Sequence, residues 1–177
     1  YSKWNKQSTY TTHNHKIKYV RTYNITYCTT GMYQNALATA GIEDAEIVVA
    51  GPYNISGTAA LVGAIKSYEN MTGETVSQEN VDTATNELVV TGKLAESVGD
   101  SDKAEQLVGA VKEQVVEGSD NGKELTEEEI GNVVDQAAQE MDVQLSDEDR
   151  QEIVALMDKI KGLDIDVDSL KEQAKDL

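Results

Sequence analysis

The stretch AGPYNISGTAAL, residues 50–61, joins a short apolar run to a run with helical periodicity. The preceding run, AEIVVAG at residues 45–51, is bounded by polar residues and by a Gly-Pro pair, which is typical of a buried strand. The following run, residues 57–71, carries an apolar stripe at helical spacing, formed by Ala60, Leu61, Ala64 and Ile65. We therefore predict a corner here, with Pro52 ending a strand and Gly57 opening a helix.

Upstream of this corner, the sequence from residue 16 to residue 28 alternates with a period of two. Such alternation, in a segment rich in tyrosine and β-branched residues, predicts a strand. One face of this strand collects Ile17, Tyr19, Arg21, Tyr23, Ile25 and Tyr27. Residues 31–41 then predict a short helix that Gly41 terminates. The order strand, helix, strand indicates a small α/β layer.

Downstream of Pro52 the sequence is helical almost to its end. Apolar stripes recur near residues 79–98 and 102–116, and again from Ile130 and from Ile153. Capping boxes are predicted before the last two stripes, pairing Thr126 with Glu129 and Ser146 with Asp149. The fold class is therefore predicted as α+β and mostly α, with an N-terminal strand-helix-strand layer followed by a bundle of about five to six short helices.

The chain is expected to divide into three parts of different composition. Residues 1–15 form a polar, basic head, residues 16–75 a small α/β subdomain, and residues 76–177 an acidic helical subdomain. The whole chain has a formal net charge of −17, and residues 1–22 carry five basic residues and no acid, so the remainder carries −22. Such an acidic body repels phosphate backbones, and we therefore predict no nucleic-acid binding.

Several classes of site and location are disfavoured by composition. A single cysteine, Cys28, excludes an intramolecular disulfide, and no Cys/His spacing fits zinc, so neither a metal nor a cofactor is predicted. The sequence has no run near 18 apolar residues, which predicts that it is not an integral membrane protein. It begins without Met and lacks a signal-type run, as expected of a mature or trimmed chain.

The corner itself is the strongest candidate for chemistry. A nucleophilic Ser56 would need a base, but the two histidines, His13 and His15, both lie in the polar head. We therefore predict no catalytic residue and interpret Ser56 as a helix N-cap. The alternative is a hydrolase or small-ligand site in a concave pocket at Pro52–Gly57, where free helix amides bind an anion. That hypothesis assigns the ligand to Asn54, Ser56, Gly57 and Thr58.

A calcium-responsive module is a further alternative, because residues 117–128 partly match a calcium-binding loop. Glu117 occupies the first position, where aspartate is usual, and Glu124 occupies a position that is normally apolar. We therefore interpret this segment as a polar turn between two helices.

Three segments resemble one bacterial family. They are TYNITYCTTGMYQNALATAGIEDAEIVVAGPYNISGTAALVGAIKSYENMTGE, NELVVTGKLAESVGD and IVALMDKIKGLDIDVDSL, so the likeness covers about residues 22–177. The sequence resembles the YpuA-like secreted proteins of Gram-positive bacteria, catalogued as domain of unknown function number 1002. The resemblance implies export and residence outside the cell or at its surface, and an additional N-terminal region that is absent here. It implies no reaction, cofactor or catalytic residue.

These observations favour a secreted or cell-surface-associated protein without catalysis, whose role is interaction or assembly. An unpaired strand edge is a template for pairing with another chain. We therefore predict a homo-oligomer or filament that forms by exchange of the N-terminal strand. The residues assigned to this assembly strand are Ile17, Tyr19, Tyr23, Ile25 and Tyr27.

Overall fold

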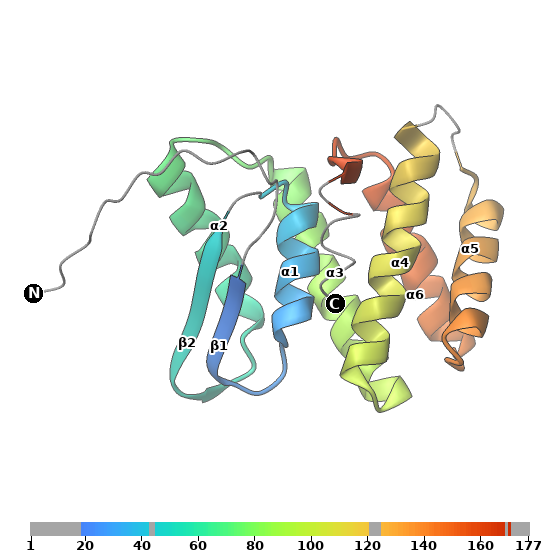
Figure 1. The fold of residues 1–177 in the computed structure, drawn as a ribbon, viewed down its shortest axis with the longest axis horizontal. Coiled ribbons are helices and arrows are strands. Elements are labelled where there is room, and N and C mark those ends of the chain that lie inside the picture. The colour runs from blue at the N-terminus through green and yellow to red at the C-terminus, as the bar shows by residue number, and fades with distance from the viewer. Residues whose placement is uncertain (1–18, 43–44, 121–124, 169, 171–177) are drawn as a thin grey trace, which may run out of the picture.

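The computed structural model describes residues 19–42, 45–120, 125–168 and 170 of the chain. Its elements are β1 (Tyr19–Ile25), α1 (Thr30–Thr39), β2 (Glu46–Ile55), α2 (Thr58–Thr72), α3 (Gln78–Val98), α4 (Ser101–Asp120), α5 (Glu127–Glu140) and α6 (Asp147–Ile160). The two strands lie at one side of the molecule, α4, α5 and α6 lie at the other, and α1 and α3 lie between them (Figure 1). The prediction of an α+β, mostly α fold is confirmed.

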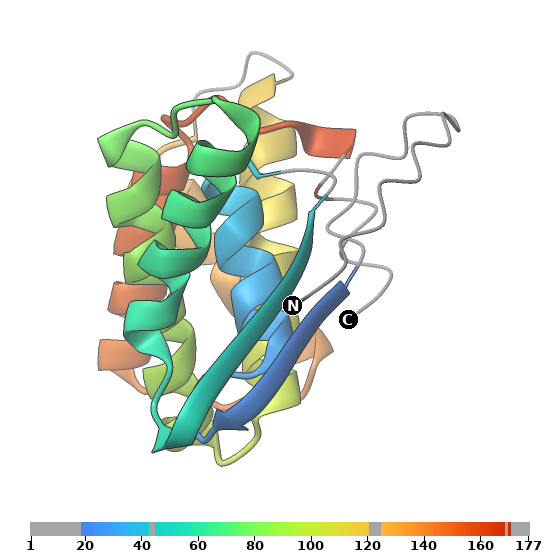
Figure 2. The same cartoon turned by 90° about the vertical axis from the view of Figure 1, so that its left-hand side faces the viewer.

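The strands β1 and β2 form a parallel sheet, with Tyr19 opposite Glu46 and Arg21 opposite Val48. One face turns inward, where Val20 and Val49 are buried. The helix α1 connects the two strands and lies behind this face in Figure 2. The other face carries Arg21, Tyr23, Glu46, Val48 and Ala50, and all five are exposed.

The predicted alternation of the first strand is wrong beyond Asn24. Asn24 has a φ of 57°, in the left-handed region that asparagine tolerates better than most residues. Its side-chain amide donates a 2.8 Å hydrogen bond to the carbonyl of Gly51. The register jumps at this point, because Tyr23 is opposite Ala50 but Ile25 is opposite Ile55. As a result Tyr23 faces solvent, whereas Ile25 packs against the core.

The corner between β2 and α2 also differs from the prediction. Pro52 does not end the strand, which continues through an irregularity to Ile55. Ser56 does not cap α2; the N-cap is Gly57, with a φ of 93° and no side-chain cap. The Tyr33 hydroxyl donates to the Gly57 carbonyl at 2.6 Å. A Cβ on Gly57 would lie 2.4 Å from that hydroxyl and 2.6 Å from Cγ2 of Ile25, so close packing and backbone conformation both require glycine here.

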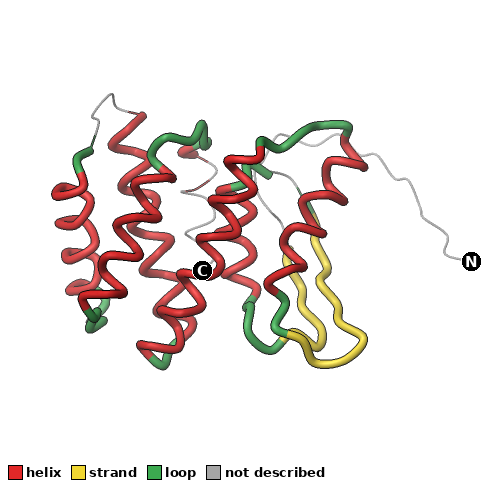
Figure 3. Tube along the Cα trace, turned by 180° about the vertical axis from the view of Figure 1, so that it is seen from behind, coloured by secondary structure: helices red, strands yellow, loops and turns green. Residues whose placement is uncertain are grey.

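The helices follow their predicted stripes, and short loops join α2 to α3, α3 to α4 and α5 to α6 (Figure 3). Both capping boxes are confirmed: Thr126 pairs with Glu129 at the start of α5, and Ser146 pairs with Asp149 at the start of α6. Buried side chains from the α/β layer and from the helices form one cluster, which includes Met32, Leu37, Leu61, Leu88, Leu107, Val134 and Ile153. The proposed division into three parts stays a prediction.

Candidate functional site

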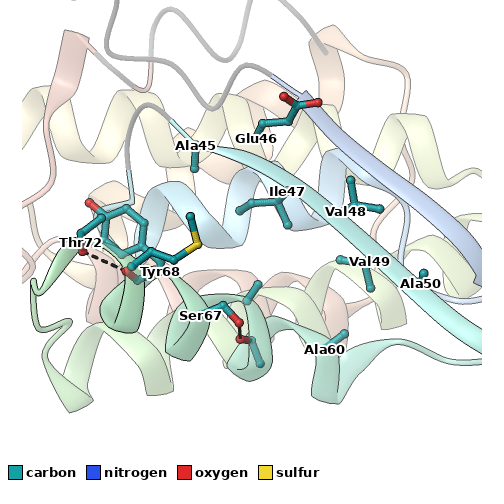
Figure 4. A pocket seen from close by; sticks show the side chains of 13 residues that line it. Ala45, Glu46, Ile47, Val48, Val49, Ala50, Ala60, Ser67, Tyr68 and Thr72 are labelled. Atoms are coloured by element: carbon teal, nitrogen blue, oxygen red, sulfur yellow. Dashed lines mark hydrogen bonds between the residues drawn. The ribbon is translucent and has the colours of Figure 1, made fainter. Parts of the chain in front are cut away.

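A groove of about 560 Å³ runs between β2 and α2 (Figure 4). One wall is the consecutive run of residues 45–50, and the other is the side of α2 that carries Ala60, Gly63, Ala64, Ser67, Tyr68, Met71 and Thr72. Consecutive strand residues point to opposite faces of a sheet. Because all six residues of the run line the groove, the groove follows the edge of β2 and not one of its faces.

Small side chains on α2 keep this groove open. Ala60, Gly63, Ala64 and Ser67 follow one another at helical spacing, and a Cβ added to Gly63 would meet nothing within 4 Å. Apolar side chains are exposed along it: Met71 is 84% exposed and Val48 is 57% exposed. An open strand edge beside apolar side chains is the geometry in which proteins accept an extended peptide.

The polar groups of the groove do not form a catalytic arrangement. The Ser67 hydroxyl donates to the Gly63 carbonyl at 2.8 Å, and the Thr72 hydroxyl donates to the Tyr68 carbonyl at 2.9 Å. The Tyr68 hydroxyl donates to the carboxylate of Glu74. Histidine, cysteine and lysine do not occur among the lining residues, and Glu46 provides the one carboxylate among them.

The residues proposed from sequence for the corner ligand site lie outside this groove. Asn54 and Ser56 are exposed, Thr58 is half-buried, and Gly57 is buried beneath Tyr33. None of the four lines the groove between β2 and α2. A ligand site at this corner stays a prediction.

A second notable feature is a buried ion pair that sequence reasoning missed. Lys112 on α4 and Glu87 on α3 are 1% and 0% exposed, and the Lys112 Nζ lies 2.8 Å from Glu87 Oε1. The same ammonium donates to the Asn35 carbonyl at 2.8 Å and to the Thr39 hydroxyl at 3.2 Å. The Thr39 hydroxyl in turn donates to the other oxygen of Glu87. These contacts use all three ammonium donors, as a buried charge requires.

The positions of Lys112 and Glu87 in the sequence indicate that both charges are buried. Lys112 lies four residues after Val108, and Glu87 lies three residues after Ala84, so both charges fall beside predicted apolar stripes. Because the whole cluster is buried, it is closed to a substrate from solvent. Its ion pair and hydrogen bonds connect α1 to α3 and α4.

A further buried carboxylate, Glu105, binds the start of α1. Its carboxylate accepts a hydrogen bond from the Thr29 hydroxyl, and its backbone carbonyl accepts one from the Asn35 amide at 3.1 Å. Burial raises the pKa of Glu105 above its ordinary value, and the Thr29 bond opposes that shift. Since Thr29 is also the N-cap of α1, Glu105 stabilises the orientation of that cap.

Cys28 is packed as a core residue and is 3% exposed. Burial raises the pKa of its thiol, and a hydrogen bond with Tyr33 opposes the shift only in part. A reactive cysteine needs a lowered pKa and access to solvent. Cys28 therefore has the environment of a structural residue.

Within residues 19–42, 45–120, 125–168 and 170, no cluster of three His, Cys, Asp or Glu side chains could hold a metal ion. In the same ranges no helix combines the length and the hydropathy needed to cross a membrane. Residues 121–124 of the partial calcium loop, and both histidines, lie outside the described residues.

Comparison with known proteins gives a family. The model of DUF1002, a protein of unknown function, matches residues 8–177. The chain belongs to the DUF1002 family. It is 39% identical over 154 residues to the uncharacterized protein YpuA of Bacillus subtilis (strain 168), an alignment that covers 87% of this chain and 52% of that protein. The chain therefore spans about half the length of this curated relative.

No solved structure matches this DUF1002 chain. The family resemblance expected from the sequence is confirmed. Neither the family description nor the relative's name states a reaction.

Proposed function

We propose that this DUF1002 chain is a secreted or cell-surface-associated interaction protein that acts without catalysis and self-associates through its N-terminal strand. The location rests on the likeness to YpuA-like secreted proteins. The absence of catalysis is supported by the lining of the groove and by the closure of the buried cluster to solvent.

The outer face of the sheet carries this proposal, because no element of the described residues covers it. Parallel sheets are normally covered on both faces, and a two-stranded sheet has little stability by itself. Here the outer face exposes Tyr23 and Val48, which are 56% and 57% exposed on neighbouring strands. Within the described ranges β1 pairs only with β2, so its other edge offers unpaired backbone groups to a second chain.

The residues predicted for the assembly strand contribute unequally. Tyr23 is exposed and can contact a partner. Ile25 and Tyr27 are half-buried against the core, and Tyr27 lies over Gly92 of α3. Ile17 and the side chain of Tyr19 lie outside the described residues. Association is therefore expected to depend on Tyr23 more than on Ile25 or Tyr27.

Size-exclusion chromatography with light scattering, over a wide range of protein concentration, tests self-association. We expect a mass above that of the 19.3 kDa monomer, and we expect the double variant Tyr23→Lys/Val48→Lys to be monomeric. A matched control, Asn132→Lys/Gln136→Lys, adds the same charge at exposed positions of α5 and should associate as the wild type does. A strictly monomeric wild type at high concentration would refute the proposal.

A further inference from the structure

We infer that the groove between β2 and α2 binds the basic N-terminal segment, residues 1–18, of a second copy of the chain. This inference rests on the proposed self-association and identifies both its acceptor and its donor. The segment would add to the edge of β2 as an extended strand, with its alternate side chains against α2.

The acceptor edge lacks the features that usually protect edge strands. Proteins block open edges with lysine, proline, bulges or a covering element. Residues 45–50 contain neither lysine nor proline, and α2 stands back from this edge across the groove. The regular hydrogen-bond ladder ends after residue 50. The register jumps there, and Pro52 has no amide hydrogen to donate. The available edge is about 16 Å long at the usual rise of a strand.

Charge selects the occupant. Glu46 is the one charged residue that lines the groove, and Tyr68, which also lines it, donates its hydroxyl hydrogen to the carboxylate of Glu74. The body of the chain carries −22, so it attracts a cationic segment. Residues 1–18 carry four lysines and no acid, and include the run STYTT at residues 8–12, whose threonine and tyrosine favour strands. The N-terminal segment therefore complements the groove in both charge and backbone preference.

Topology favours a second copy over the segment's own groove. Because β1 and β2 are parallel, the chain enters both strands at the same end of the sheet, with Tyr19 opposite Glu46. To reach the far edge of β2, residues 1–18 of the same molecule would have to cross the connection that enters β2 from α1. Connections at one end of a sheet rarely cross in this way.

Since donor and acceptor are different surfaces, the contact is heterologous. Two copies that exchange segments reciprocally form a closed dimer, and one-way donation forms an open chain.

Gly63→Leu is the decisive variant, because it fills the groove at a position where a Cβ meets nothing and where leucine favours the helix. The matched control is Ala59→Leu, at an exposed position of α2 that does not line the groove. In full-length chains studied by light scattering, we expect Gly63→Leu to weaken association by about tenfold or more. Ala59→Leu should leave association unchanged, and both variants should keep the wild-type melting temperature or raise it.

A peptide of residues 1–18 provides an independent test. Excess peptide should dissociate wild-type oligomers, and a peptide with its four lysines replaced by serine should do so less well. Association that persists in Gly63→Leu and is abolished in Tyr23→Lys, at a position that does not line the groove, would overturn this inference while leaving the proposed function intact. A monomeric wild type would overturn both. A different result would overturn the second-copy inference alone. In that result, residues 45–50 of the monomer are protected from hydrogen exchange and lose this protection in Gly63→Leu, because the segment then binds the groove of its own molecule.

Discussion

Replacing Lys112 with methionine should be among the most destabilising single substitutions in the chain. The change keeps most of the volume of the aliphatic stem but removes the ammonium that contacts Glu87, the Asn35 carbonyl and the Thr39 hydroxyl. Glu87 is 0% exposed, so within the described part of the chain its charge would retain the Thr39 hydroxyl as its one hydrogen-bond donor.

Breaking one partner out of a buried ion pair costs about 3–5 kcal/mol, because the other charge is left uncompensated. This is a large fraction of a stability that is typically about 5–15 kcal/mol. With a urea dependence of roughly 2 kcal/mol per molar, the midpoint of unfolding should fall by about 1.5–2.5 M. Urea unfolding at pH 7, followed by circular dichroism at 222 nm, measures this shift.

The double variant Lys112→Met/Glu87→Leu separates charge from packing. If the cost of the single variant comes from an unpaired carboxylate, removing that carboxylate should recover most of the lost stability, since apolar replacements of buried pairs are often neutral or stabilising. A loss below about 1 kcal/mol in Lys112→Met, or a double variant as unstable as the sum of the two single variants, would refute the reasoning.

Three further predictions concern the corner, a buried carboxylate and the helix caps. Gly57→Ala should lower the free energy of unfolding by more than about 2 kcal/mol, because alanine is strained in the left-handed region and its Cβ contacts the Tyr33 hydroxyl. The double variant Gly57→Ala/Tyr33→Phe should lose less stability than the sum of the two single variants, and thermal unfolding of the three variants tests this. Glu105→Gln should be neutral or stabilising at pH 7. Burial raises the pKa of Glu105 in the folded state, so the wild type loses stability from this group as pH rises through that pKa. Urea titrations across pH should therefore show the advantage of Gln vanishing below the ordinary pKa of 4.5. Thr126→Ala and Ser146→Ala should each cost about 1 kcal/mol in the same urea assay, and no change in either variant would contradict the assigned capping boxes.

Helical periodicity and local capping predict most of the helical part of this fold. The stripes on α3 to α6 extend over several turns, and each capping box depends on only four consecutive residues. Both signals are local, so tertiary packing changes them little.

The corner and the groove could not be predicted in this way, because they depend on residues distant in the sequence. Ser56 has the type and position of an N-cap, but Tyr33, 24 residues before Gly57, fixes the chain at Gly57 and displaces the cap. Ala60 and Ala64 belong to the apolar stripe predicted for α2, and only the position of β2 beside this helix shows that they line a groove. The pairing of Lys112 with Glu87 likewise requires knowledge that α3 and α4 are neighbours.

The location of the buried ion pair gives the sheet a mechanical anchor. The helix α1 is the crossover between β1 and β2, and its Asn35 and Thr39 both bind the ammonium of Lys112 on α4. A pull on either strand by an attached molecule would therefore pass through α1 into the helices, and not only through the two-stranded ladder. In a force-extension experiment, detachment of the strands should then need a higher force in the wild type than in Lys112→Met.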